Sequence, residues 1–202
     1  SSATIVSLSG DGSRMAVSVP DNSSNRGLVR VYEWDSGSGS WTQQGLGLEG
    51  RTSAPYFFGG AIDISEDGNQ LAIGGVGFVS PPVIGYVQIF SWDGGAWVQK
   101  GSDINGTSSF DLFGQALSIS SDGDRVAIGA RNTGTPSVRV YDWQSGISTW
   151  NQVGEIVGSG SFPVSISESG SRLAIGNLSS PGTAKIFDWD GSTFSQTGSD
   201  IA

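Results

Sequence analysis

The residues of this chain that could carry chemistry are its acids. Among 202 residues there are 19 Asp and Glu, but no His and no Cys. Without His the chain lacks the commonest general base and the commonest ligand of transition metals. Without Cys it lacks thiolate nucleophiles, thiolate zinc sites and disulfides. The enzymatic chemistry that stays open is hydrolysis by two carboxylates, for which an asymmetric pair in one pocket would be the signature.

Six of these acids recur at equivalent positions of a repeated pattern. They are Asp11, Asp67 and Asp122 in one kind of turn, and Asp35, Asp93 and Asp190 in a second kind. An active site normally breaks the symmetry of a repeat protein, whereas these acids preserve it. Asp is favoured in turns because its carboxylate accepts hydrogen bonds from the backbone two residues further on. The pattern therefore predicts turn structure for these acids and a protein that is not an enzyme.

Asp63 departs from this pattern. It stands where the other repeats have Ser7, Ser118 and Ser165, on the first strand of each repeat. If these strands line a central channel, the four side chains form a polar ring there. Such a ring could hold a hard cation such as calcium, or only water. The solvated channel is the favoured interpretation, and no cofactor or metal is expected beyond this calcium hypothesis.

The elements that position these side chains are four similar units. Each unit reads as a short apolar strand, a tight turn with Gly, a second apolar strand, a variable loop, an alternating third strand and a fourth strand. The third strands end at Trp34, Trp92, Trp143 and Trp189. Four antiparallel strands in about 40 to 50 residues are typical of one propeller blade. The sequence therefore predicts an all-β propeller of four blades.

The expected blades span about 1–52, 53–108, 109–158 and 159–202, within a single domain. The link between the third and fourth blades is as long as the two terminal segments together. This agreement predicts a closed ring in which blades one and four pack side by side. The alternative is a slice of a larger propeller or of a tandem array, cut in register.

Short motifs at the blade starts resemble a known family. Phe58-Gly59-Gly60-Ala61 and Phe113-Gly114-Gln115-Ala116 precede first strands, and Leu71-Ala72-Ile73-Gly74 forms a second strand. These residues resemble the FG-GAP-type repeats of integrin α-chain-like propellers, which implies extracellular recognition or adhesion. Blades one and four have Thr4-Ile5 and Phe162-Pro163 instead of the Phe-Gly pair. The calcium loop of those repeats is missing, so the resemblance does not imply calcium binding.

Aromatic residues outside the repeat are the better candidates for contact with a ligand or partner. The recurring Trp residues are expected to pack between blades. The candidates in variable segments are Tyr56, Phe57, Phe78, Pro81, Pro82 and Phe110. Variable loops on a rigid scaffold are where recognition usually occurs, and an exposed apolar loop favours a protein contact.

The net charge of −9 excludes some partners. Such a surface repels nucleic acid and anionic membranes, and no apolar run is long enough to insert into a membrane. Three Asn-x-Ser/Thr sequons begin at Asn22, Asn105 and Asn177, which suggests a secreted or cell-surface glycoprotein. We therefore expect an extracellular structural or adhesion module that binds proteins or copies of itself. The alternative is a lectin-like module that binds carbohydrate through loop aromatics.

Overall fold

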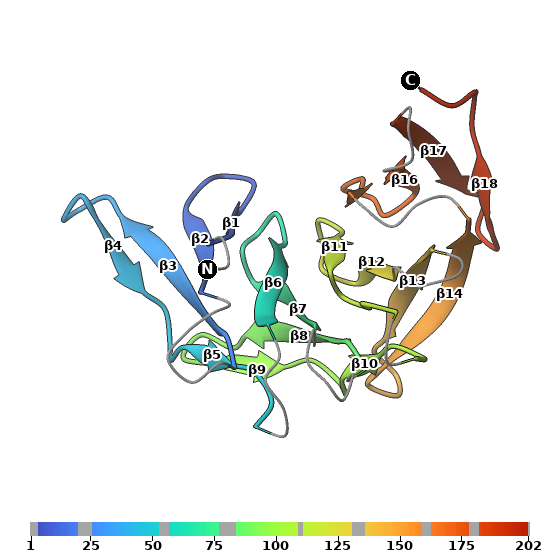
Figure 1. The fold of residues 1–202 in the computed structure, drawn as a ribbon. Helices are drawn as coiled ribbons and strands as arrows, with labels where there is room; N and C mark the ends of the chain where they lie inside the picture. Colours follow the sequence, from blue (N-terminus) through green and yellow to red (C-terminus); the bar gives the residue numbers. More distant parts are fainter. Residues whose placement is uncertain are drawn as a thin grey trace.

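The structure of the chain is a computed structural model. It describes residues 4–19, 26–52, 57–76, 84–108, 111–130, 136–158, 163–177 and 182–201. All the regular secondary structure within these ranges is β, and it forms four sheets that follow one another along an arc (Figure 1). Each sheet is one blade, so the prediction of four blades of antiparallel strands is confirmed.

In the described part of the chain, eighteen strands build the four blades. Blade 1 contains β1 (Val6–Leu8), β2 (Arg14–Val19), β3 (Leu28–Asp35), β4 (Ser40–Gln43) and β5 (Leu48–Glu49). Blade 2 contains β6 (Phe57–Ile64), β7 (Gln70–Val76), β8 (Tyr86–Trp92), β9 (Trp97–Gln99) and β10 (Ile104–Asn105). Blade 3 contains β11 (Ala116–Ile119), β12 (Arg125–Ala130), β13 (Ser137–Gln144) and β14 (Thr149–Val157). Blade 4 contains β15 (Val164–Ile166), β16 (Arg172–Asn177), β17 (Thr183–Trp189) and β18 (Phe194–Gln196).

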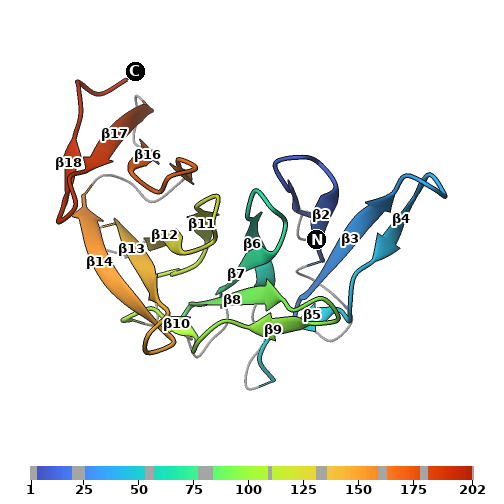
Figure 2. The ribbon, with the colours of Figure 1, turned by 180° about the vertical axis from the view of Figure 1, so that it is seen from behind.

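Within a blade the chain runs as an antiparallel meander. In blade 3 the strand order is β11-β12-β13-β14, and the other blades repeat it. The fourth strand is split in blades 1 and 2, where β5 and β10 return to pair with β3 and β8. The first strands β1, β6, β11 and β15 lie at the inside of the arc, and the fourth strands lie at its outside (Figures 1 and 2).

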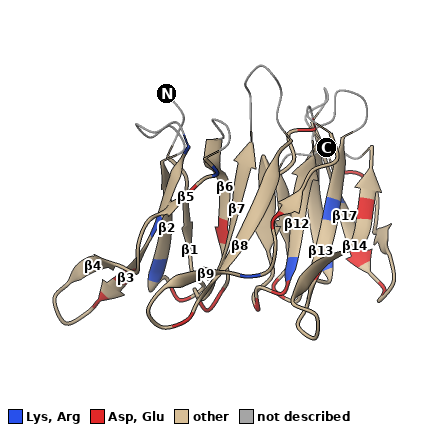
Figure 3. Cartoon of the chain, turned by 90° about the horizontal axis from the view of Figure 1, so that it is seen from below, with Lys and Arg blue, Asp and Glu red and all other residues tan. Residues whose placement is uncertain are grey.

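The turn between the first and second strands is held by a Ser and an Asp. In blade 2, Ser65 Oγ and the Asn69 N–H both donate to Asp67 Oδ1, at 2.6 and 2.9 Å. The Gln70 N–H in turn donates to Ser65 Oγ at 2.9 Å. Blades 1 and 3 repeat these bonds, and Ser169 replaces the Asp in blade 4. The acids of this pattern therefore stabilise turns, which lie along one edge of the arc (Figure 3).

The hydrophobic core lies between blades rather than within them. Each blade presents one face to the blade before it, which we call its incoming face, and the opposite face, its outgoing face, to the blade after it. Between blades 1 and 2, Ala16, Val29 and Val31 of the outgoing face pack against Leu71 and Ile73 of the incoming face. Equivalent residues form the cores between blades 2 and 3 and between blades 3 and 4. An end blade therefore has one face without a neighbouring blade in this chain.

The Phe-Gly pair of blade 3 brings two backbones into close contact. A Cβ built on Gly74 of β7 would lie 1.9 Å from the Gly114 carbonyl oxygen, and one built on Gly85 would lie 2.1 Å from the Phe113 oxygen. Gly114 itself has a φ of 87°, which favours glycine. The Phe113 side chain is fully buried in the core between blades 2 and 3. The motif is thus a docking element between successive blades.

The arc stays open between blades 1 and 4 (Figures 1 and 2). The expectation that these two blades pack side by side is wrong. Leu8 on β1 is 55% exposed, whereas its equivalents Ile64 and Ile119 are 5% and 6% exposed. Ring closure depends on the angle between successive blades, and equal segment lengths carry no information about that angle.

Candidate functional site

Three of the four residues expected to form a polar ring are joined by hydrogen bonds. Ser7 Oγ donates to Asp63 Oδ1 at 3.1 Å, and Ser118 Oγ donates to Asp63 Oδ2 at 3.1 Å. The Ile119 N–H donates to Asp63 Oδ2 at 2.9 Å. Asp63 therefore connects the first strands of blades 1, 2 and 3.

The same pattern continues to blade 4 through backbone donors. The Ile64 N–H donates to Ser7 Oγ, the Ile119 N–H to Asp63, and the Ile166 N–H to Ser118 Oγ. Each first strand thus donates to the polar side chain of the blade before it. Ser165 is the last of these side chains, and it is exposed. In the described residues these side chains form a ladder along an open arc rather than a closed ring (Figure 1).

The hydrogen bonds of this ladder join neighbouring blades. Burial raises the pKa of Asp63, and the hydrogen bonds from Ile119, Ser118 and Ser7 oppose that rise. Both carboxylate oxygens accept hydrogen bonds from protein donors, which is the arrangement of a buried acceptor that is satisfied by the fold. The described residues contain no group of three or more Asp and Glu placed to hold a metal ion. A hollow of about 310 Å³ lies beside this ladder, with Glu66 and Glu168 at its wall.

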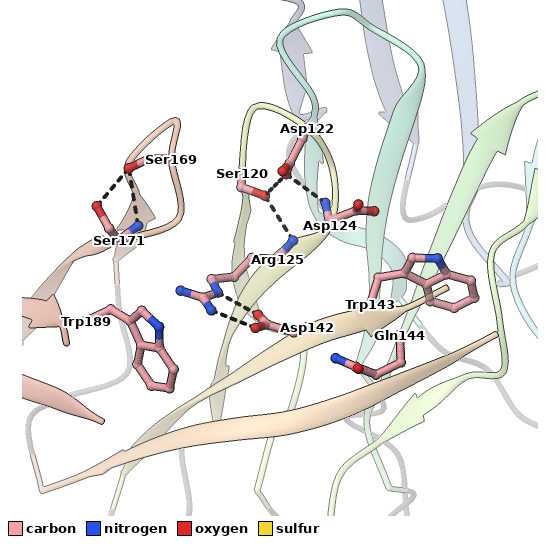
Figure 4. Close-up of a pocket in the computed structure, with 10 residues that line it drawn as sticks. All are labelled: Ser120, Asp122, Asp124, Arg125, Asp142, Trp143, Gln144, Ser169, Ser171 and Trp189. Carbon is pink, nitrogen blue, oxygen red and sulfur yellow. Dashed lines mark hydrogen bonds and ion pairs between the residues drawn. The ribbon is translucent and has the colours of Figure 1, made fainter. Parts of the chain in front are cut away.

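A second hollow, of about 370 Å³, lies between blades 3 and 4 (Figure 4). The guanidinium of Arg125 crosses it. Its Nε and Nη2 donate to the two carboxylate oxygens of Asp142 at 2.5 and 2.6 Å, and its Nη1 donates to the Gly170 oxygen at 2.9 Å. The Arg125 Cζ lies 4.8 Å from the ring centre of Trp189. Three carboxylates line this hollow, and each already has a partner in the protein: Asp142 pairs with Arg125 and Asp124 with Lys100, while Asp122 accepts hydrogen bonds from its own turn.

Sequence reasoning missed this arginine and its equivalent in blade 1. Arg14 bonds Glu33 in its own blade, donates to the Gly68 oxygen of blade 2 and lies 5.8 Å from the Trp92 ring centre. The available signal was the basic residue that opens the second strand in blades 1, 3 and 4. Its partner is a backbone oxygen of the next blade, and a sequence does not display that contact.

The recurring aromatic residues pair within each blade and pack against the blade before it. The pairs Trp34–Trp41, Trp92–Trp97, Trp143–Trp150 and Trp189–Phe194 have ring centres 4.9–5.5 Å apart. Trp150 Nε1 also donates to the Lys100 oxygen of blade 2 at 2.8 Å. Blade 1 has no preceding blade in this chain, and Trp34 and Trp41 are exposed together with Val6 and Leu8. The incoming face of blade 1 is therefore an uncovered apolar surface.

The predicted loop residues lie largely outside the described part of the chain. Phe57 opens strand β6 and is half-buried. Tyr56, Phe78, Pro81, Pro82, Phe110 and the sequon residue Asn22 lie outside the described residues. Asn105 ends β10 with an exposed side chain, and Asn177 ends β16 half-buried. No helix in the described ranges is long and apolar enough to span a membrane.

Comparison with known proteins identifies the fold. No protein-family model matches the chain, and no curated protein sequence matches it. A protein from Lactobacillus plantarum is 19% identical with a TM-score of 0.63, over 99% of this chain and 55% of that one. The Dos1 propeller is 14% identical with a TM-score of 0.60, over 96% and 48%. The β-propeller domain of the Trilobed protease from Pyrococcus furiosus, which has an open velcro topology, is 15% identical with a TM-score of 0.53, over 96% and 57%.

The chain thus spans about half the length of the solved structures that it matches. Sequence identities this low show the fold and nothing finer. They support a propeller, and they do not single out the FG-GAP repeats that the Phe-Gly motifs resemble. By its sheets and by these neighbours, the chain has the fold of a β-propeller.

Proposed function

We propose that this chain is a non-enzymatic, extracellular propeller module whose task is to bind protein, as a structural or adhesion component. The observation that carries the proposal is the uncovered incoming face of blade 1. Its apolar residues Val6 and Leu8 are exposed on β1, and Trp34 and Trp41 are exposed on the paired strands β3 and β4. Exposed apolar surface of this kind marks a contact with another macromolecule.

The described polar residues support a binding role over a catalytic one. Asp63 accepts three hydrogen bonds from the protein, and Asp142 is paired with Arg125. Hydrogen bonds from the Ser13 backbone and from Ser9 lower the pKa of the turn residue Asp11 to about 2, the reverse of what a general acid at neutral pH needs. The sequence also has no His or Cys to take the role of base or nucleophile.

The expected partner is a protein rather than a sugar, nucleic acid or membrane. Two tryptophans line the hollow between blades 3 and 4. Trp189 lies under Arg125 and against Phe194, and Trp143 packs against Trp150, so both rings serve the packing of the blades. The net charge of −9 disfavours nucleic acid and anionic lipid. Carbohydrate binding through loop aromatics stays the alternative of the sequence analysis, without support from the described residues.

Site-specific photocross-linking tests the proposal. A photoreactive phenylalanine at position 34 should cross-link to protein under native conditions, and no product should form when the irradiation is carried out in urea. The matched control places the same residue at Ile147, which is 70% exposed in the turn between β13 and β14 and lies away from both end faces. Equal labelling at 34 and 147, or none at 34, would contradict a binding role for the blade 1 face.

The extracellular location has its own test. Native protein should lose mass on treatment with an N-glycosidase, because Asn105 is exposed and its side chain lies at the end of a strand. Asn105→Gln should lower the mass of the native protein by the mass of one glycan. A native protein whose mass is unchanged by the enzyme would overturn the assignment as a secreted glycoprotein.

A further inference from the structure

We propose that the two end faces of this chain bind each other between two copies, head to tail, so that two open arcs close into one ring of eight blades. This inference rests on the proposed function and names the protein partner as a second copy of the chain. It follows from comparing what the three internal blade interfaces contain with what the two end faces lack.

The internal interfaces repeat one set of backbone bonds. In the turns between first and second strands, the Gly10 N–H donates to the Glu66 oxygen at 2.8 Å, the Glu66 N–H to the Ser121 oxygen at 3.2 Å, and the Ser121 N–H to the Glu168 oxygen at 2.9 Å. The next bond of this series would run from the Glu168 N–H to the Gly10 oxygen of another copy. The same holds for the ladder at the inside of the arc, where exposed Ser165 is the equivalent acceptor for a Leu8 N–H.

The arginine contacts to the following blade also repeat, and they too stop at blade 4. Arg14 and Arg125 donate to the Gly68 and Gly170 oxygens of the following blade, and their side chains are 13% and 15% exposed. Arg172 makes the equivalent ion pair with Asp188, yet its side chain is 59% exposed. The equivalent acceptor would be the Gly12 oxygen of an incoming blade 1.

The aromatic contacts give the third match. A Cβ built on Gly45, Gly101 or Gly154 would lie 2.7–3.1 Å from the aromatic pair of the next blade. Gly198 holds the same position in blade 4, with a φ of 76° and open space in front of it. In blade 1, Trp41 is 38% exposed, whereas Trp97 is 8% exposed. Gly198 on one copy is thus shaped to receive the Trp34–Trp41 pair of another.

What the outgoing face of blade 4 lacks is therefore what the incoming face of blade 1 offers. A head-to-tail contact gives a closed ring when its rotation closes, and a filament when it does not. The four blades form an open arc, and the chain spans about half of the solved propeller structures that it matches (Figure 1). Two arcs joined at both ends therefore give a ring of the size that those lengths indicate.

Sedimentation of the 202-residue chain tests this inference. We expect one species of twice the 20.9 kDa chain mass at micromolar concentration. Leu8→Asp blocks only the incoming face, and Ser165→Arg blocks only the outgoing face. Each should weaken the dimer by at least about 100-fold, because an unpaired charge would be buried in the contact. The control Ile147→Asp, at an exposed position away from both faces, should leave the dimer intact.

Mixing the two blocked variants distinguishes head-to-tail contact from a symmetric one. Together, Leu8→Asp and Ser165→Arg retain one intact pair of faces, so the mixture should form a dimer that neither variant forms alone. Circular dichroism of each variant checks that it is folded. A chain that stays monomeric, a dimer that survives Ser165→Arg, or a ladder of larger species would each overturn the two-copy ring. A monomer that still cross-links to another protein from position 34 would overturn this inference alone and leave the proposed function standing.

Discussion

Replacing Gly74 by alanine should lower the free energy of unfolding by about 3 kcal/mol or more, because the new methyl group would collide with backbone. The Cβ would lie 1.9 Å from the Gly114 oxygen, which belongs to the first segment of the next blade. A flexible side chain could turn away from such a contact, but a carbonyl held in the close approach of two blades cannot. Urea unfolding followed by circular dichroism at a fixed protein concentration measures the loss.

Gly146→Ala is the matched control for this substitution. Gly146 lies in the turn between β13 and β14, has nothing within 4 Å of a built Cβ, and does not have a positive φ. Its replacement should change stability by less than about 0.5 kcal/mol. Gly85→Ala, whose Cβ would meet the Phe113 oxygen at 2.1 Å, should behave like Gly74→Ala. If Gly74→Ala unfolds at the same urea concentration as the unchanged chain, blades 2 and 3 do not approach each other as described.

The parts of the fold that could be predicted from the sequence are those that depend on residues close together in the chain. The turns are an example: Asp67 and Asp93 stand before glycines in short turns, and both accept hydrogen bonds from those turns. The strands and the four repeats followed from the same local patterns. These features depend on residues a few positions apart, so one sequence contains the information that fixes them.

Contacts between blades were harder to predict from the sequence. Arg14 and its acceptor, the Gly68 oxygen, are 54 residues apart, and a backbone oxygen has no signature in the sequence. Ring closure was predicted wrongly for a related reason. The angle between blades is set by close approaches such as Gly74 against Gly114, and small differences there add up over successive blades. Matching terminal lengths report the phase of the repeat and leave this angle undetermined.

The candidate site shows the same division. Asp63 stood out because it breaks a column of serines, and the structure joins it to Ser7 and Ser118 of that column. Its role could not be predicted, since the choice between a cation site and a tie depends on the donors around it. The Ile119 N–H is one of those donors, and it faces Asp63 only once blades 2 and 3 are docked.

Replacing Asp63 by alanine should therefore lower the free energy of unfolding by about 2–4 kcal/mol, because three donors lose their acceptor. The Ile119 N–H is the most costly of the three, since Ile119 is buried and a buried backbone donor without an acceptor is destabilising. Asp63→Asn keeps an acceptor oxygen and removes the charge, so it should cost less than the alanine variant. Urea unfolding of the three proteins measures the order.

The pH dependence separates this buried charge from the other acids. Burial raises the pKa of Asp63 above its ordinary value of 3.8, so the folded chain binds a proton there more tightly than the unfolded chain does. The stabilisation that this proton brings is present below pH 3.8 and is lost as the pH rises through the folded pKa.

Comparing Asp63→Asn with the unchanged chain isolates this effect. Asp188, whose pKa is lowered to about 2 by Arg172 and Thr197, has the opposite dependence, but it is present in both of these proteins. Subtracting the stability of the unchanged chain from that of Asp63→Asn cancels such shared groups, and the difference should become steadily more negative as the pH falls through the folded pKa of Asp63 toward 3.8. If this stability difference did not vary with pH, Asp63 would not be desolvated in the folded chain. The hydrogen bonds through which Asp63 joins blades 1, 2 and 3 would then be weaker than their geometry indicates.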